Sequence, residues 1–208
     1  MTRTSIITDI IRANQYTTYL EVGVATGENI RGVVTIPGLH VVGVDPEPRC
    51  EYVTHPVDSD TFFRANQETF DIVFIDGCHV EEQVDKDVAN ALSVLSQGGT
   101  IVMHDCNPAT YQHATNDWLL DEWNGTVWRS VVKIRCTNAA VTLRVVDPDY
   151  GCGILTRGAS VPYAKADVET CLRWDYFDAN RGEILNLIPC DEFARLYLGV
   201  ESNGGVIR

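Results

Sequence analysis

The stretch that decides the fold is TYLEVGVATG at residues 18–27, a β-rich run that ends in a glycine turn. Residues 18–22 are predicted to form a strand, and a helix can begin in residues 28–34. Glycines at a strand-to-helix turn let the backbone approach a ligand closely. The stretch therefore predicts the opening unit of an α/β domain, with a ligand cradle at Gly23 and Gly27.

The same alternation continues along the first half of the chain. Helices are predicted at residues 5–12 and 81–95, the second with an apolar stripe and an end at Gly98 and Gly99. Further strands are predicted at residues 40–45, 71–76 and 100–105, with a weaker one near residues 52–54. The clearer runs are almost continuously apolar, which is typical of parallel strands covered on both sides. The pattern predicts a doubly wound, Rossmann-like, mostly parallel sheet with helices on both faces.

The second half is less regular. Residues 107–123 are predicted to be a loop and helix, and residues 127–135 and 141–146 to be strands. Residues 151–155 are predicted to turn into a last strand. We interpret the 208 residues as one domain, with a cofactor-binding core at about 18–108 and acceptor-side elements at about 109–208.

Composition narrows the function classes. There are 29 Asp and Glu against 16 Lys and Arg, which gives a net charge of −13 and argues against a nucleic-acid partner. No apolar run approaches the roughly 18–20 residues that span a bilayer, so we expect a soluble, cytoplasmic protein without a membrane partner. The seven cysteines lack metal-ligand or disulfide spacing, and we expect reduced thiols.

Polar residues close most of the predicted strands, at the edge where open α/β sheets bind ligands. They are Glu21, Asp45, Asp76, His104 and Asp105. Asp45 lies eighteen residues after Gly27, where a carboxylate can accept hydrogen bonds from ribose hydroxyls. The spacing predicts a nucleoside site, against the alternative of a purely structural turn.

Absent motifs indicate which nucleoside is bound. Ala25 stands where a dinucleotide fingerprint would carry its middle glycine, and neither a GxxxxGK phosphate loop nor a Tyr-x-x-x-Lys pair occurs. Glu21 would repel a pyrophosphate but suits a cationic ligand. These features favour S-adenosylmethionine, which carries no phosphate, over a dinucleotide or a nucleoside triphosphate.

Two segments carry a family resemblance: Ile75-Asp76-Gly77-x-His79 and the run from Gly98-Gly99 to His104-Asp105. Over roughly residues 18–108 the chain resembles the class I S-adenosylmethionine-dependent methyltransferases, and among them the small-molecule and sugar O-methyltransferases similar to macrocin O-methyltransferase. The resemblance implies that Asp76 and Asp105 hold a divalent cation, usually magnesium, and that His79 is the base. His104 departs from that pattern, because a second carboxylate is expected there, and we include it in the candidate metal set.

The chemistry of the residues supports the same roles. Methyl transfer to a hydroxyl can use a base to remove the proton and a cation to stabilise the developing charge. The unperturbed histidine pKa near 6.5 suits His79 as that base. Structural alternatives remain: Asp76 as a helix cap, His79 as a solvated loop residue, and His104 as a core residue at a strand end.

Weaker features complete the candidate site. Ser59 is predicted to cap a helix, and contact of Asp58 or Ser59 with adenine is the alternative. An aromatic platform for a sugar is one hypothesis for Trp118, Trp123 and Trp128, and core packing is the other. Residues 124–126 are predicted to form a tight turn, and His113 is a spare candidate for the base.

The sequence therefore predicts an S-adenosylmethionine-dependent O-methyltransferase that acts on a hydroxyl of a small polar acceptor, a sugar or glycan. Its candidate cofactor residues are Glu21, Gly23, Gly27, Asp45, Ser59 and Asp76. The alternatives are a non-catalytic nucleoside-binding domain and a nicotinamide-dependent oxidoreductase. The identity of the acceptor and the formation of a homo-oligomer are left open.

Overall fold

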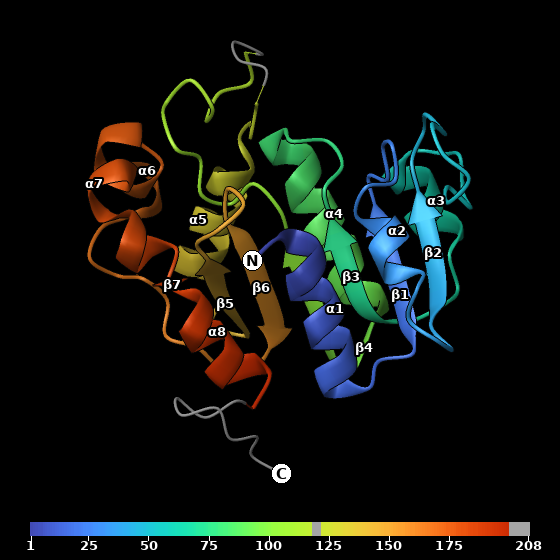
Figure 1. The fold of residues 1–208 in the computed structure, drawn as a ribbon. Helices are drawn as coiled ribbons and strands as arrows, with labels where there is room; N and C mark the ends of the chain where they lie inside the picture. The colour runs from blue at the N-terminus through green and yellow to red at the C-terminus, as the bar shows by residue number, and fades with distance from the viewer. Residues whose placement is uncertain (118–121, 200–208) are drawn as a thin grey trace.

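The computed structural model describes residues 1–117 and 122–199. These residues contain a seven-stranded sheet in the order β2-β1-β3-β4-β6-β5-β7. The strands are β1 (Thr18–Val22), β2 (His40–Val44), β3 (Phe70–Ile75), β4 (Leu95–Met103), β5 (Val141–Val146), β6 (Cys152–Arg157) and β7 (Leu187–Ile188) (Figure 1).

The sheet is parallel in the first half of the chain and mixed in the second. β1 pairs in parallel with β2 and β3, and β3 pairs in parallel with β4. β6 runs antiparallel to both β4 and β5, whereas β7 is parallel to β5. The predicted fold class and the main strands of the first half are confirmed, because their apolar runs are buried on both faces of the sheet.

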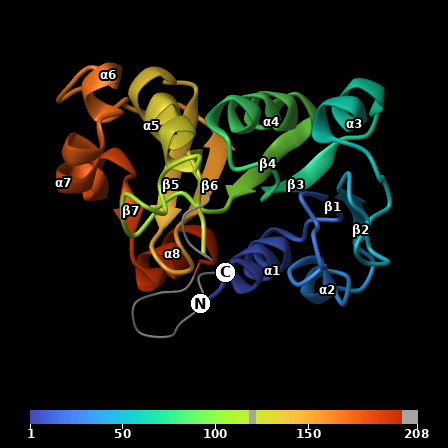
Figure 2. The same cartoon turned by 90° about the horizontal axis from the view of Figure 1, so that it is seen from above.

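Helices cover both faces (Figure 2). They are α1 (Arg3–Asn14), α2 (Ile30–Val33), α3 (Ser59–Ala65), α4 (Glu81–Val94), α5 (Val127–Thr137), α6 (Val168–Cys171), α7 (Trp174–Ile184) and α8 (Cys190–Tyr197). The core on one face includes residues of α3, α4, α5 and α7, and the core on the other includes residues of α1, α2 and α8. Within residues 1–117 and 122–199, no helix combines the length and the apolar character that a bilayer crossing requires.

Three local predictions are wrong. Residues 52–54 form no strand, and the only pairing near them is an isolated bridge between Val44 and His55. The helix predicted at residues 81–95 is confirmed as α4 to within one residue, but its predicted stop at Gly98 and Gly99 is wrong, because both glycines lie inside β4. Residues 127–135 form a helix, because their apolar residues recur at helical spacing and pack as one buried face, although their β-branched content favours a strand.

The topology brings distant segments to one edge of the sheet. β1, β2, β3 and β4 end there, and the antiparallel pairing of Met103 with Gly153 brings the start of β6 to the same edge. In Figure 1 the yellow-green segment that precedes α5 rises above this edge. Loops from both halves of the chain therefore meet where the predicted site residues lie.

Candidate active site

A cavity of about 550 Å³ opens at this edge of the sheet. It is lined by Val22, Gly23, Ala25, Val44, Asp45, Pro46, Glu47, Arg49, Asp58, Ser59, Asp60, Asp76, Gly77, Cys78, Gln83 and Asp87. The size lies within the range of small-molecule sites. Six of the lining side chains are acidic and one is a cation, so the cavity disfavours phosphate groups and suits a ligand with positive charge.

The glycine turn packs tightly on the end of β3. Gly23 has φ +88°, and a Cβ there would lie 2.2 Å from the backbone oxygen of Asp76. Gly27 has φ +80° and faces Cys50 rather than the cavity, because a Cβ there would lie 2.8 Å from the Cys50 sulfur. Gly23 thus lines the cavity, whereas Gly27 allows the turn to close over its neighbours.

Asp45 fixes the shape of the glycine turn. Its Oδ2 accepts hydrogen bonds from the amides of Val24 (3.0 Å) and Ala25 (2.8 Å), and its Oδ1 accepts from the amide of Glu47 (2.8 Å). A carboxylate has about four acceptor positions, so three of them are used by the backbone. The acceptor capacity that remains is enough for one ribose hydroxyl.

The helix cap that the sequence assigns to Ser59 is instead provided by Asp58. Asp58, not Ser59, caps α3: its side chain accepts from the Thr61 amide (2.7 Å) and hydroxyl (3.0 Å). The cap position has the extended backbone that a capping residue needs, and Ser59 is already helical. Ser59 lines the cavity beside Asp60.

Glu21 lies outside the cavity. It is 1% exposed and accepts hydrogen bonds from the Tyr19 hydroxyl and from Asn29 Nδ2 (2.7 Å). Burial raises the pKa of Glu21 to about 7, and it outweighs the two hydrogen bonds, which lower that pKa. The carboxyl group is therefore part of a buried polar cluster behind the glycine turn.

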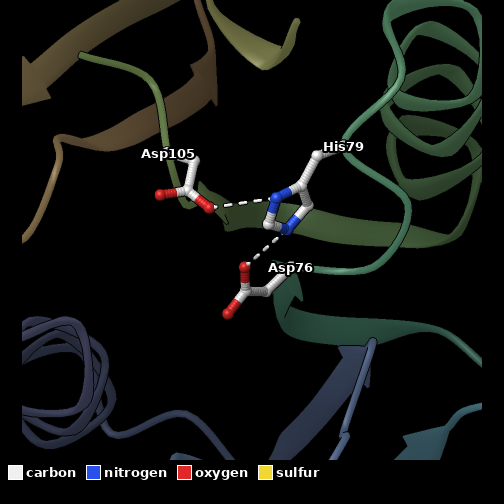
Figure 3. Close-up of side chains that lie close together, drawn as sticks. All are labelled: Asp76, His79 and Asp105. Atoms are coloured by element: carbon white, nitrogen blue, oxygen red, sulfur yellow. Dashed lines mark ion pairs between the residues drawn. The ribbon is translucent and has the colours of Figure 1, made fainter. Parts of the chain in front are cut away.

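The catalytic candidates converge beside the cavity (Figure 3). His79 Nε2 lies 3.3 Å from Asp76 Oδ1, and His79 Nδ1 lies 3.3 Å from Asp105 Oδ2. One ligand atom from each of the three residues lies within 4.8 Å of the others. Asp76 follows β3 and Asp105 follows β4, so the parallel pairing of these strands places the two carboxylates on either side of His79. Asp105 adopts the left-handed conformation (φ +59°), a strained geometry that is common at functional sites.

The charged groups of the cluster shift one another's pKa values. Burial on its own raises the pKa of Asp76, but the charges of His104 and His79 and their hydrogen bonds hold it well below its usual range. The pKa of His79 is raised, because its contacts with Asp76 and Asp105 outweigh the lowering by burial. The cluster therefore favours the ionised form of Asp76 and the protonated form of His79.

His104 lies against the same two carboxylates. Its Nδ1 is 3.3 Å from Asp76 Oδ1 and 3.3 Å from Asp105 Oδ2, and its Nε2 is 3.4 Å from Asp149 Oδ1. Burial opposes the charged form, but Asp76, Asp105 and Asp149 raise the pKa of His104 far above its usual range. These contacts are those of a buried cation, and the expected place of His104 among the metal ligands stays a prediction.

Arg3 and Asp149 belong to this cluster, and sequence reasoning missed both. Arg3 Nη1 is 3.3 Å from Asp149 Oδ1, and Arg3 Nε is 3.8 Å from Asp76 Oδ2. A hydrogen bond from His104 is the main reason that the pKa of Asp149 falls to about 2. The only signal for Asp149 was its turn sequence Asp147-Pro148-Asp149, and Arg3 gave none because it opens a helix far away in the chain.

Residues 123–126 lie directly on His79. The Trp123 ring stacks on the imidazole with 5.3 Å between centroids and 21° between planes. The Thr126 amide donates to the His79 backbone oxygen (2.7 Å), and a Cβ at Gly125 would lie 2.2 Å from that oxygen. Asn124 is 2% exposed and donates from Nδ2 to Asp105 Oδ1, while its Oδ1 has no hydrogen-bond partner among the described residues. The predicted tight turn is thus a lining element of the site.

The remaining candidates lie away from the cluster. Trp128 is buried and packs against Trp174 and Phe177, which agrees with core packing, the alternative to a sugar platform. Trp118 falls outside the described residues. His113 contacts the Thr110 hydroxyl through Nδ1 (2.8 Å) and lies beside Tyr150, with 5.8 Å between ring centroids.

Similarity to known proteins agrees with this geometry. Residues 20–106 match the model of a protein family that is described as a methyltransferase domain. The match agrees with the methyltransferase core predicted over roughly residues 18–108. The matched segment includes the strands that precede Asp45, Asp76 and Asp105. No curated protein matches the chain at a significant level.

Solved structures share the fold of this chain, and the likeness extends into its second half. Methyltransferase PaMTH1 of Podospora anserina, bound to SAH, is 16% identical, with a TM-score of 0.58 over 76% of this chain and 80% of its own. The O-methyltransferase of Bacillus cereus, also in complex with SAH, is 15% identical, with a TM-score of 0.53 over 74% and 80%. TomG of Streptomyces achromogenes, in complex with SAM, is 16% identical, with a TM-score of 0.55 over 77% and 82%.

Proposed function

We propose that the protein transfers a methyl group from S-adenosylmethionine to a hydroxyl of a small polar acceptor, with a divalent cation at the acceptor site. The observation that carries the proposal is the convergence of Asp76, His79 and Asp105 at the rim of the cavity. The O-methyltransferases among the similar structures support hydroxyl oxygen as the methylated atom.

The cavity fits the methyl donor. Its acidic lining matches a ligand whose sulfur is positively charged, and it would repel the pyrophosphate of a nicotinamide dinucleotide. Asp45 would hold the ribose, Gly23 would allow close approach of the backbone, and Ser59 would face the adenine end. When bound, S-adenosylmethionine supplies an activated methyl group.

The donor set beside the cavity also fits a cation. Two carboxylates and an imidazole are a mixed oxygen and nitrogen set, which suits Mn²⁺ as well as Mg²⁺. The unpartnered Asn124 Oδ1 is a further oxygen at this site, and an unpaired buried acceptor is costly unless a ligand satisfies it. Asp76, His79 and Asp105 would hold the ion, and a bound cation would favour the ionised form of an acceptor hydroxyl.

The role of His79 follows from its contacts. Both ring nitrogens face carboxylates, so His79 lies between the two acids that would share a cation with it. We therefore assign His79 to the cation site. Its role as the base stays a prediction with its own signature: because the pKa of His79 is raised, the rising limb of a pH–rate profile would lie above pH 6.5 and would disappear in His79→Ala.

We propose a sugar hydroxyl as the acceptor. Trp123 is partly exposed and lies flat beside His79, which gives the site an aromatic surface of the kind that packs against sugar rings. The chain also contains Glu122 and Tyr150, which hydrogen-bond to each other across the loop that precedes α5 and the β5–β6 turn. These groups supply polar contacts for a hydroxylated ligand.

The test is transfer of labelled methyl from S-adenosylmethionine to a panel of sugars, glycosides and other small hydroxyl compounds. We expect label on oxygen, a loss of roughly 10²–10⁴-fold after chelation or in Asp105→Asn, and recovery of the chelated enzyme with Mg²⁺ or Mn²⁺. Asp9→Asn is the matched control, because Asp9 pairs with Arg12 on α1 and does not line the cavity. Cofactor binding without transfer to any acceptor would instead favour a non-catalytic nucleoside-binding domain.

A further inference from the structure

Gln83 is a cavity residue that the sequence gave no reason to select. It lies in the first turn of α4, directly after the loop that carries Asp76 and His79. Its Nε2 faces three acceptors: Ser59 Oγ (3.1 Å), Asp60 Oδ1 (3.2 Å) and Asp87 Oδ1 (3.1 Å).

These partners fix which way the amide of Gln83 points. The opposite orientation would place the amide oxygen against the carboxylates of Asp60 and Asp87, where only a donor is favourable. Nε2 is therefore held on that side, and Oε1 points away from the three acceptors. Among residues 1–117 and 122–199, none donates a hydrogen bond to Oε1.

Asp87 helps to hold the amide of Gln83 in this orientation. It is 1% exposed, one helical turn after Gln83, and it also lines the cavity. A buried carboxyl group at this position is costly unless its hydrogen bonds are satisfied. The contact with Gln83 meets that need and restricts the rotamers of the amide.

The neighbouring groups are committed to other contacts. The Asp58 carboxylate caps α3 through the Thr61 amide and hydroxyl, and Ser59 Oγ accepts from Gln83. Gln83 Oε1 is thus an oriented acceptor at the α3 side of the cavity. That side is also lined by Asp58, Ser59 and Asp60, where the proposed cofactor would place its adenine base.

We propose that Gln83 Oε1 accepts a hydrogen bond from the exocyclic amine of adenine and so selects an adenine nucleoside, with Asp60 and Asp87 as positioning residues for the amide. The inference rests on the proposed cofactor. Hypoxanthine carries a carbonyl oxygen where adenine carries that amine, so an inosine analogue would face Oε1 with a second acceptor. Such a mismatch leaves both groups unpaired in a partly dehydrated site.

The test is calorimetric binding of S-adenosylhomocysteine and S-inosylhomocysteine to the wild type, Gln83→Leu and Gln67→Leu. Gln67→Leu is the matched control, because Gln67 is exposed and outside the cavity. We expect the wild type and the control to prefer the adenosyl ligand by about 10–100-fold. In Gln83→Leu we expect the preference to fall to about 3-fold or less, mainly through weaker adenosyl binding.

A folded Gln83→Leu variant that keeps the wild-type preference would overturn the proposal, and so would a wild type that binds both ligands equally. Either result would leave the methyl-donor assignment intact, because the adenosyl ligand would still bind. Failure of the wild type to bind either ligand would overturn both. Asp87→Asn adds a second readout: it keeps the oxygen that accepts from Gln83, so we expect most of the preference to survive.

Discussion

The two halves of the molecule contribute to the site in different ways. In residues 18–106 the acidic site residues come at or just after the ends of parallel strands, as Asp45 follows β2 and Asp76 follows β3. In residues 107–199 the contributing side chains come from loops, as Asn124 does, or from the β5–β6 turn, as Asp149 does. The first half therefore sets the positions of the reacting groups, and the second half surrounds and orients them.

The difference also concerns how each half is held in place. Strand-end residues inherit their position from the ladder of backbone hydrogen bonds, which the buried apolar strands stabilise. The second-half residues depend on close contacts with the first half, such as that of Gly125 with His79. Substitutions in the first half should therefore act through the buried sheet and its surroundings, whereas substitutions in the second half should act by displacing a loop from the first half.

The largest expected effect concerns a buried acid of the first half. Glu21 has a pKa of about 7 in the folded protein against an ordinary value of 4.5, so the folded state binds its proton more tightly than the unfolded state. The wild type therefore loses stability as pH rises from about 4.5 to 7. The free energy of unfolding of Glu21→Gln, measured relative to that of the wild type, should therefore rise by on the order of 3 kcal/mol over this pH range. Above about pH 7 the difference should stay constant.

Urea unfolding of both proteins between pH 4.5 and 8 measures this difference. Glu51→Gln is the control, because Glu51 is exposed and makes no ion pair with the other described residues. If the curves of the wild type and Glu21→Gln run parallel across this range, the buried cluster of Glu21, Tyr19 and Asn29 does not carry the cost that we assign to it.

A smaller effect is expected where the second half contacts the first. Gly98 and Gly125 both have positive φ, but a Cβ at Gly98 meets nothing within 4 Å, whereas one at Gly125 would meet the His79 backbone at 2.2 Å. Gly98→Ala should cost about 1 kcal/mol from backbone strain alone. Gly125→Ala should cost about 1–3 kcal/mol more, because the loop must move off His79.

The free energies of unfolding of the two variants provide the comparison, and the fluorescence of Trp123 reports on the displaced loop. Equal losses of stability in Gly98→Ala and Gly125→Ala would show that the close approach to His79 is not what holds the loop.

The contrast between the halves also explains what could be predicted from the sequence. β1 was predicted with its bounds, Thr18–Val22, because an apolar β-rich run ends at a glycine turn there. α5 was predicted as a strand, because Val127, Val131 and Val132 favour a strand locally, whereas their burial on one helical face is a tertiary property. No element after residue 157 was predicted, and α7 and α8 lie there.

The candidate site follows the same division. Asp76, His79 and Asp105 were selected from their places near strand ends and from the family resemblance, and the parallel pairing of β3 and β4 accounts for their convergence. Arg3, Asn124 and Asp149 were not selected as ligands or partners of that group, because each reaches it through a contact between segments that are distant in the chain. Gln83 was missed because its role depends on the orientation of its amide, which spacing does not reveal.

The most direct test of the account is the binding of Mn²⁺ to the protein loaded with S-adenosylhomocysteine, measured by electron paramagnetic resonance. We predict one bound ion per chain in the wild type and in Asp9→Asn, and loss of that ion in Asp105→Asn, which removes a ligand charge supplied by the end of β4. Absence of bound Mn²⁺ in the wild type, or equal binding by Asp105→Asn, would contradict the cation site on which the proposed mechanism depends.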